Sequence, residues 1–486
     1  MPKALLLLLI ALLLLAPNAT TVRAQDAAET TDALAPTPAP AAVAPVQEEA
    51  TATEEEESAA PVVAVEEAVV PAVESLPPWR LQLNHYAERE NWLKSHQAPL
   101  PTLTREALEE AIDAAGMYLV NQQTSQGNFR YAYDFISEEE DDSDNQVRQA
   151  GALWGICNLN RYRFTEDTRR CAILGLDFFM RGQRGLPDAD VITTTYQGQP
   201  VIRTGTVALF CLSLMDFLEG QERYLTEKQQ EPFLRALENN LKFLQFQELP
   251  SGSWREEYEL GGMRLPEDIA PVSSYFDGEA LLACMTAALF YQAHPALQEP
   301  YDLKARCRFS LEALMKRYVI EAFALDGDAE ETRGFYQWGV MACLQAWRLF
   351  PEDAAARDIA WKGAMGLSWW QIYAHRLESR QGNTAFAVEG LVAAAEVARL
   401  AGDSEQSKLL GETAERILTR LMTWQVGGPF MDVNPFLAAR RNSLPQKAFG
   451  GITSTQDTGY IRIDVVQHQL HAMLMVAEYL FPEGKP

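Results

Sequence analysis

Apolar residues recur with the 3.6-residue period of α-helices from residue 105 to residue 481, and no segment shows the alternation of a strand. The pattern predicts twelve helices, over residues 105–122, 145–162, 165–182, 203–220, 226–247, 272–293, 301–321, 333–350, 354–376, 383–401, 404–425 and 461–481. Boundary signals agree in places: Thr226 precedes a polar first turn, Pro351 follows the eighth helix, and Gly402 ends the tenth. We therefore expect an all-α fold.

The even-numbered helices are richer in small and apolar residues than the odd-numbered ones. Gln149–Trp154 and Glu279–Cys284 illustrate the first kind, and the charged stretch Glu227–Lys242 the second. A helix that is apolar most of the way round is buried, whereas a one-faced helix is peripheral. The alternation predicts six inner and six outer helices, that is, an (α/α)6 toroid of six helical hairpins.

Connection lengths support a double ring. Those entering an inner helix are longer than those leaving one, and cover residues 123–144, 183–202, 248–271, 322–332, 377–382 and 426–460. In a double ring, all connections of one kind lie at one end. The long loops should therefore gather above the N-termini of the inner helices, and loops on a rigid scaffold often carry function.

A weak repeat marks the ends of three outer helices, where Gln is followed by Gly and an aromatic residue. The copies are Gln123–Phe129, Gln247–Trp254 and Gln425–Phe430. Glycine allows a turn at a helix end. This ending resembles the repeat of triterpene cyclases, and the helix pattern resembles the α/α-toroid superfamily of six-hairpin glycosidase-like proteins and terpenoid cyclases. No DxDD-type protonation motif of the cyclases is present.

Two fragments resemble the toroid domain of uronyl C5-epimerases: Phe386–Leu391, which contains Glu389, and Ile461–Leu470, which contains Asp464 and His468. Together these resemblances imply a toroid domain over residues 80–486. They also imply carbohydrate chemistry inside it.

The first 24 residues read as a signal peptide, with Lys3 ahead of the apolar run Ala4–Leu15 and small residues before Gln25. Residues 25–79 contain 12 Asp and Glu but no Lys or Arg, which predicts a disordered acidic tether. We expect a protein exported to the periplasm or the extracellular space. An uncleaved signal acting as an anchor is the alternative.

The formal charge of −26 and the pI near 4.7 argue against nucleic-acid partners and anionic membrane surfaces. No later segment is long and apolar enough to predict a membrane span. All six cysteines fall inside apolar helical patterns, so we expect buried free thiols. Export would make disulfides possible, and Cys157 with Cys171 is the pair to test.

Four inner helices carry an arginine near the first turn, which the positive end of the helix dipole disfavours. They are Arg148, Arg203, Arg333 and Arg462. One interpretation is a bowl that binds an anionic ligand, with Gln149 beside Arg148. The alternative is that acidic residues of the same end neutralise these arginines.

Acid and base candidates occupy similar places on three inner helices. Tyr275, Asp277 and Glu279 open the sixth helix, and Glu389 lies near the start of the tenth. Proton transfer needs one group that holds a proton and another that releases it. Asp277 could instead cap its helix, and Glu279 could bond to a neighbouring helix.

Asp464, His468 and His471 lie near one face of the twelfth helix, and they form a further acid/base candidate centred on Asp464 and His468. Tyr133, Trp254 and Tyr336 could stack on sugar faces, although packing between hairpins explains such aromatics equally well. The sequence has no HExxH motif and no nucleotide-binding glycine loop, so we expect no metal and no cofactor.

These features favour an exported carbohydrate-active enzyme that acts on an acidic saccharide by hydrolysis, elimination or epimerisation. One alternative is a non-catalytic module that binds a glycan or a protein. Another is a terpenoid-cyclase-like protein, which would line its lumen with Phe and Trp rather than Arg.

Overall fold

The computed structural model describes residues 99–187, 189–325 and 328–482. The predicted signal peptide, the acidic tether and residues 80–98 lie outside the described residues. The long helices are α3 (Arg105–Gln122), α4 (Gln146–Tyr162), α5 (Glu166–Arg181), α6 (Thr204–Gln221), α7 (Glu227–Gln247), α8 (Ser274–Ala293), α9 (Leu303–Met315), α11 (Glu330–Leu349), α12 (Ala354–Tyr373), α13 (Ala385–Leu400), α14 (Ser404–Met422) and α16 (Ile463–Met475). All twelve predicted helices are therefore confirmed.

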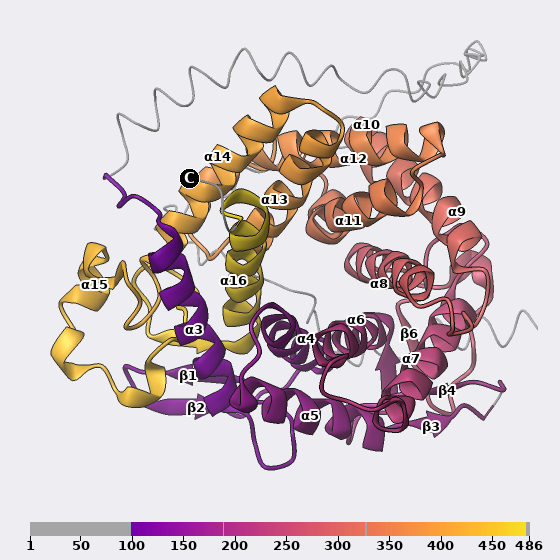
Figure 1. The fold of residues 1–486 in the computed structure, drawn as a ribbon, viewed down its shortest axis with the longest axis horizontal. Coiled ribbons are helices and arrows are strands. Elements are labelled where there is room, and N and C mark those ends of the chain that lie inside the picture. Colours follow the sequence, from indigo (N-terminus) through magenta and orange to yellow (C-terminus); the bar gives the residue numbers. More distant parts are fainter. Residues whose placement is uncertain (1–98, 188, 326–327, 483–486) are drawn as a thin grey trace, which may run out of the picture. The chain divides into compact units, whose positions relative to one another are not determined.

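These helices form two concentric rings (Figure 1). The inner ring is α4, α6, α8, α11, α13 and α16, each packed against the next, and α16 packs against α4 to close the circle. The other six surround it as hairpin partners. The expected (α/α)6 toroid is thus confirmed.

Burial follows the composition of the two helix types. The inner helix α6 has every residue from Thr204 to Met215 buried, whereas the outer helix α14 buries one face and exposes residues such as Glu412. Outer helices begin at Thr or Asp residues such as Thr104 and Asp403, whose side chains accept a bond from the first turn. Five inner helices begin without such a bond, α4 with its Asn145 cap being the exception.

Two helices change winding near their ends, which the apolar period did not predict. After α9 the chain forms the π-helical segment η3 (Lys316–Glu321), and after α16 it forms η8 (Val476–Leu480). The short helices α10 (Ala322–Leu325) and α15 (Pro435–Ala438) lie in connections. Single 3₁₀ turns cover Glu267–Ile269, Leu377–Ser379, Met431–Val433, Arg441–Ser443 and Gln446–Ala448.

The long loops that enter the inner helices contain short strands, which were also missed because two or three residues show no detectable alternation. They are β1 (Ala132–Asp134), β2 (Glu139–Asp141), β3 (Arg184–Gly185), β4 (Ile192–Thr193), β5 (Val201–Arg203), β6 (Glu257–Glu259) and β7 (Tyr460–Arg462). All pairs are antiparallel. The pairing of β1 with β7 joins the loop before α4 to the loop before α16, with Tyr133 opposite Ile461.

The Gln–Gly–aromatic repeat has a structural role. Its glycines Gly127, Gly252 and Gly427 have φ of 109°, 81° and 70°, a region that other residues rarely adopt. Each turn reverses the chain after an outer helix, and the first two close with the bridges Gln123–Phe129 and Glu248–Trp254. The Gln123 amide also donates to Cys171 O at 2.8 Å, tying one hairpin to the next.

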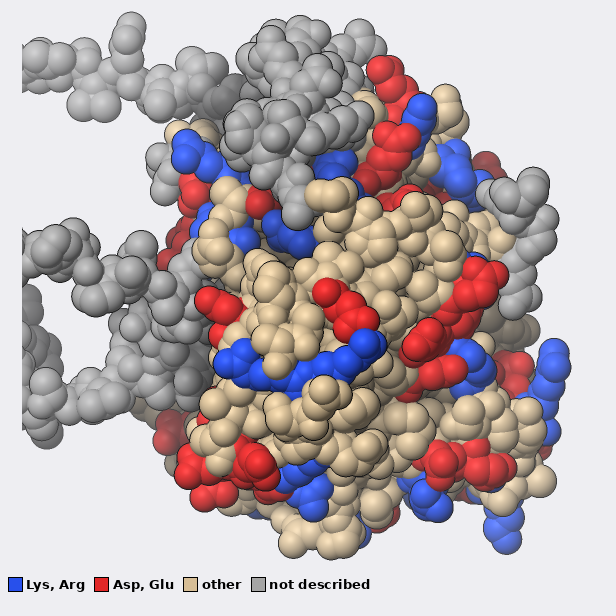
Figure 2. All heavy atoms as spheres, turned by 90° about the vertical axis from the view of Figure 1, so that its left-hand side faces the viewer, with Lys and Arg blue, Asp and Glu red and all other residues tan. Residues whose placement is uncertain are grey.

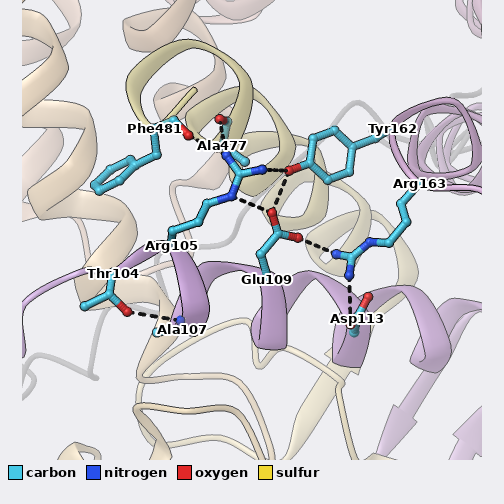
Figure 3. A network of polar contacts seen from close by, with 9 residues as sticks. All are labelled: Thr104, Arg105, Ala107, Glu109, Asp113, Tyr162, Arg163, Ala477 and Phe481. Atoms are coloured by element: carbon cyan, nitrogen blue, oxygen red, sulfur yellow. Dashed lines mark hydrogen bonds and ion pairs between the residues drawn. The ribbon is translucent and has the colours of Figure 1, made fainter. Parts of the chain in front are cut away.

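A polar network joins the first hairpin to the last (Figure 3). Arg105 on α3 donates to the Tyr162 hydroxyl at 2.6 Å, to Ala477 O at 2.9 Å and to Phe481 O. It also pairs with Glu109 at 2.6 Å. Because Tyr162 ends α4 and Ala477 lies in η8, one guanidinium bonds to both sides of the seam at which the inner ring closes.

The surface carries interleaved charges. Figure 2 shows acidic and basic side chains interspersed on the described part of one face, which therefore offers no extended basic surface to a phosphate backbone. No helix in the described residues is long and apolar enough to cross a membrane. The six cysteines are free and buried.

Candidate functional site

A carboxylate flanked by two imidazoles lies where α13 meets α16. His468 Nδ1 is 3.0 Å from Glu389 Oε1, and His471 Nδ1 is 3.3 Å from the same oxygen. Glu389 is fully buried, while the side chain of His468 keeps 22% of its surface exposed. Of the three, His468 is therefore the group that a ligand can best reach. The two fragments Phe386–Leu391 and Ile461–Leu470 meet at this contact.

The charges of this cluster support one another. Burial opposes ionisation of Glu389, but His468 and His471 outweigh it and lower the pKa of the carboxyl below its usual value. Burial likewise opposes the charge on His468, yet Glu389 and Asp464 raise its pKa above the ordinary value. Glu389 and His468 therefore each favour the charged form of the other.

Two tryptophans pack against these imidazoles. The Trp154 ring lies edge-on to His471 with centroids 4.3 Å apart, and the Trp338 ring lies 6.0 Å from His468. Trp154 and Trp338 are themselves 5.9 Å apart, although they belong to α4 and α11 on opposite sides of the ring interior. The cluster therefore occupies the axis of the toroid.

A second charged group lies on the neighbouring turn of α16, towards the long loops. Asp464 pairs with Arg462 through two bonds of 2.6 and 2.9 Å, and with Arg148 Nε at 3.2 Å. Arg148 also bonds to the Tyr131 hydroxyl. Although burial opposes it, the two guanidiniums lower the pKa of Asp464. Two guanidiniums thus share the carboxylate of Asp464, and the charge of Arg462 also acts on Asp141.

Glu279 is the isolated carboxyl of the inner ring. It is 3% exposed, and within the described residues its Oε2 atom has no hydrogen-bond partner. Burial raises its pKa well above the usual value. Spacings of three and seven place it on the face of α8 that bears Leu282 and Thr286, which line the ring interior. It is suited to donate a proton.

Asp277 points elsewhere. Its two oxygens accept bonds of 2.7 Å from the Trp254 backbone amide and from the Tyr318 hydroxyl, and burial raises its pKa to about 6. Trp254 is buried, and its indole donates to Leu244 O at 3.0 Å. Asp277 and Trp254 therefore hold the loop before α8 against the outer ring.

The other predicted arginines are distributed around the long-loop end rather than gathered at one point. Arg333 pairs with the exposed Glu330 at 2.9 Å. Burial raises the pKa of Tyr275, and the charge of Arg333 opposes that shift. A fifth arginine at this end, Arg380 just ahead of α13, bonds to the carbonyl oxygen of His375. Arg203 ends β5, and no carboxylate partner is found for it among the described residues. Internal pairing therefore accounts for much of the arginine pattern.

Three further predicted ligand contacts serve packing. Gln149 exchanges two 2.8 Å bonds with the backbone of Phe129 and so anchors the loop before α4. The Tyr336 hydroxyl donates to Ala387 O at 3.0 Å between α11 and α13. Tyr133 is buried in β1, with the Lys447 ammonium 4.6 Å from its ring.

No group of His, Cys, Asp and Glu suited to hold a metal is found in the part of the chain that the structure describes. His468 Nδ1 instead bonds to Glu389 Oε1, and His471 Nδ1 lies 3.3 Å from the same oxygen without the geometry of a hydrogen bond. Sequence reasoning missed Trp154 as a site residue and the approach of His471 to Glu389. The spacing of three between His468 and His471 was the available signal, but only the ring places Glu389 opposite both.

No family model matches this chain, and no curated protein matches its sequence. Solved structures do share its fold. A GH76 alpha-mannanase of Bacteroides thetaiotaomicron aligns with a TM-score of 0.52 and 7% identity, over 77% of this chain and 96% of that one. A sugar epimerase from a ruminal bacterium gives 0.48 and 11%, over 77% and 98%. An unsaturated glucuronyl hydrolase from Streptococcus agalactiae gives 0.47 and 12%, over 83% and 96%. The alignment with the mannanase therefore agrees with the α/α-toroid fold of this chain.

Proposed function

We propose that this chain is a carbohydrate-active enzyme that moves a proton on a saccharide, as an epimerase or isomerase does. The observation that carries the proposal is the buried Glu389 bonded to the partly exposed His468 on the axis of the ring. A carboxylate behind an imidazole fixes its orientation and favours its protonated form. That arrangement is typical of a general acid/base.

The choice of proton transfer over glycoside hydrolysis rests on which groups can be reached. Hydrolysis commonly uses two carboxyl groups that both contact the sugar. Here Glu389 is fully buried and already pairs with two imidazoles, so His468 is the group left to touch a substrate. Glu279, on the face of α8 that bears Leu282 and Thr286 of the ring interior, is the candidate for the opposite proton-transfer group. Hydrolysis and elimination remain the alternative reactions.

An acidic saccharide is the substrate class that the local charge favours. Arg148 and Arg462 share the carboxylate of Asp464, so two guanidiniums lie on the long-loop side of the histidine cluster. Several inner helices also begin at this end without a side-chain cap, which directs their positive dipole ends to the same region. A uronate carboxylate would balance both contributions.

The substrate is expected to enter from the long-loop end, because Arg148 and Arg462 lie between those loops and His468. Export through a signal peptide remains part of the proposal, and would place the enzyme outside the cytoplasm. A non-catalytic glycan- or protein-binding module and a cyclase-like protein are the competing functions. The ring interior mixes Trp154 with charged side chains such as Arg161 and Asp216, which argues against a purely apolar lumen.

The test is to incubate the protein in D₂O with reducing sugars, free uronates and uronate-containing oligosaccharides, and to follow their C–H signals by NMR. We expect deuterium to replace a carbon-bound hydrogen, with a new epimer or isomer. His468→Gln and Glu389→Gln should lower the rate at least a hundredfold. The matched control is His294→Gln, because His294 also contacts a carboxylate, Glu222 at 2.8 Å, but lies away from the axis.

New reducing ends without deuterium incorporation would instead identify a hydrolase, and an unsaturated uronate would identify a lyase. Binding without any chemical change would support the non-catalytic module. Full activity of His468→Gln would refute the proposed acid/base centre.

A further inference from the structure

A groove runs between two neighbouring hairpins at the end of the toroid opposite the long loops. One side is formed by α11 and α12, and the other by the turn between α13 and α14 (Figure 1). The groove has a volume of about 780 Å³, including the solvent at its mouth. Its lining residues are Trp347, Ala354, Arg357, Asp358, Trp361, Ala401 and Asp403. None of them belongs to the histidine cluster, so the site on the ring axis leaves this groove unexplained.

Two tryptophans form the apolar part of the lining. Trp347 lies in the last turn of α11 and Trp361 in the first half of α12, and both are half-buried. Each packs against the hydrophobic core, which limits its motion. An indole combines a broad apolar face with a polar edge, which suits a ligand of the same mixed character. The groove therefore offers a firmly held amphipathic surface.

Arg357 places a guanidinium in the same groove. Its Cζ atom is 4.0 Å from the centre of the Trp347 ring, a cation–π contact that arginine commonly forms. Its Nη1 atom donates to the Pro351 carbonyl oxygen at 3.2 Å. Within the described residues no carboxylate pairs with Arg357, and no hydrogen-bond partner is found for its Nε atom. The guanidinium is thus positioned by a ring and a carbonyl group, and it keeps N–H groups for a ligand.

A second groove borders the same turn between α11 and α12, and its lining is different. It lies beside the start of α9 and has a volume of about 880 Å³, including solvent at its mouth. Its arginine, Arg308, pairs with Asp353 at 2.9 Å and with Glu312 at 3.1 Å. No tryptophan is among the described residues that line it. Gaps of this size therefore occur where hairpins meet, but the tryptophans and the unpaired arginine distinguish the first groove from this neighbour.

Two carboxylates complete the lining of the first groove. Asp403 Oδ1 accepts a bond of 3.1 Å from the Gln406 amide at the start of α14, and no partner is found for Oδ2 within the described residues. Asp358 pairs with Lys362 at 2.8 Å. The charge of Arg357 offsets that of Asp403, so the groove is close to neutral. It therefore offers hydrogen-bond donors and acceptors beside an apolar surface, without favouring one sign of charge.

We infer that this groove binds a neutral pyranose unit of a polysaccharide. One face of such a ring carries C–H groups that can pack on an indole, and its hydroxyl groups both donate and accept hydrogen bonds. Trp361 would cover the apolar face, Arg357 would donate to hydroxyl oxygens, and Asp403 would accept from a hydroxyl group. A uronate would instead bring its carboxylate close to two others.

This inference goes beyond the proposed function and does not depend on it, because binding in the groove requires no reaction on the ring axis. If the axis does act on a saccharide, the groove would be a second contact for a long chain. A second contact raises the effective concentration of the polymer at the protein without any new contact at the first site.

The test is affinity electrophoresis of the full chain in native gels that contain mannan, xylan, mixed-linkage β-glucan or polygalacturonate, each compared with a gel without polysaccharide. We expect at least one neutral polysaccharide to retard the wild-type chain. Trp361→Ala and Arg357→Gln should weaken that binding about tenfold. Arg308→Gln is the matched control, because Arg308 lines the neighbouring groove and should not affect retardation. Any retardation by polygalacturonate should be equal in all these chains, because the proposed anion contacts lie on the ring axis.

Asp403→Asn keeps the test decisive if Trp361→Ala fails to fold. Asparagine preserves the helix cap but replaces Oδ2 with an N–H donor, so binding should weaken while the Tm changes little. A wild-type chain that no neutral polysaccharide retards would overturn the inference, and so would equal retardation of the wild type and the folded groove variants. The gels measure binding without turnover. Failure of the D₂O screen would therefore refute the proposed function alone, and the gels would still decide whether the groove binds a saccharide.

Discussion

His468 Nδ1 lies 3.0 Å from Glu389 Oε1, although 79 residues separate the two in the chain. One comes from α13 and the other from α16, adjacent helices of the inner ring. In the proposed proton transfer the two residues have different roles. The buried carboxylate of Glu389 fixes the orientation of the His468 imidazole and favours its protonated form, and the partly exposed His468 contacts the ligand. Four predictions about stability and activity follow from the surroundings of this pair.

The pair should give stability a pH optimum. Glu389 has a lowered pKa, so its contribution is present above the unfolded value of about 4.3 and is lost as pH falls through the folded pKa. His468 has a raised pKa, so its contribution is complete below the unfolded value of about 6.5 and is lost as pH rises through the folded pKa. The pair should therefore stabilise most between about pH 4.3 and 6.5.

Urea unfolding of the wild-type chain and of His468→Gln between pH 4 and 9 measures this. The difference in unfolding free energy should be largest inside that window and shrink on its alkaline side. His294→Gln is the control, because its partly exposed pair with Glu222 should contribute less than about 1 kcal/mol. A pH-independent difference for His468→Gln would contradict the ion pair.

Glu279→Gln should become more stabilising as the pH rises. The raised pKa of Glu279 means that the folded chain keeps a proton that the unfolded chain loses above about pH 4.3, so folding weakens as pH rises towards the folded pKa. Glutamine is neutral and avoids this cost. The Tm difference between Glu279→Gln and wild type should grow from pH 5 to pH 8, while turnover falls at least a hundredfold. A Tm difference that stays flat over this range would mean that Glu279 is ionised.

Gly205→Ala tests how closely Glu279 packs. A Cβ atom at Gly205 on α6 would lie 2.1 Å from Glu279 Oε2 and 2.5 Å from Phe276 Cδ1. We expect a loss of about 1–3 kcal/mol of unfolding free energy. Gly366→Ala on α12 is the matched helical control, since its nearest neighbour would be 3.6 Å away, and alanine should stabilise that helix by about 1 kcal/mol. Equal effects of the two changes in denaturant titrations would contradict the close contact.

Asp464→Asn should be the most destabilising change at the site. It leaves the largely buried guanidiniums of Arg148 and Arg462 without their shared carboxylate. Breaking such a group by removing one partner costs about 3–5 kcal/mol. Chemical denaturation measures the loss, and the double variant Asp464→Asn with Arg148→Met should recover part of it. If the double variant recovers no stability, the unpaired charge of Arg148 is not the cause of the loss in Asp464→Asn.

The fold was predictable from the sequence because inner and outer helices differ in their patterns of apolar residues. The inner helix α6 is buried at every residue from Thr204 to Met215 and is apolar on all sides there, while α14 is amphipathic because it has one solvent face. Long loops before inner helices and short turns after them follow from the hairpin order. Strands of two or three residues and π-helical ends leave no period to detect.

The site was only partly predictable. Glu389 and His468 were identified, but their contact depends on α13 and α16 being neighbours in the ring, which no local pattern encodes. The arginine pattern was visible, yet pairing of Arg148 and Arg462 with one aspartate is a tertiary arrangement. The same holds for Asp277, whose partners Trp254 and Tyr318 come from a loop and from the outer ring.

The bonds that Arg105 makes to Ala477 and Phe481 span 372 and 376 residues. During synthesis the helix that carries Arg105 precedes nearly the whole domain, and its partners are made last. A growing chain can stack hairpins in order but cannot complete the circle until its final turn is available. Because contacts of such long separation form slowly, ring closure should be the late step of folding, and the alignment of α13 with α16 that creates the site should be acquired only then.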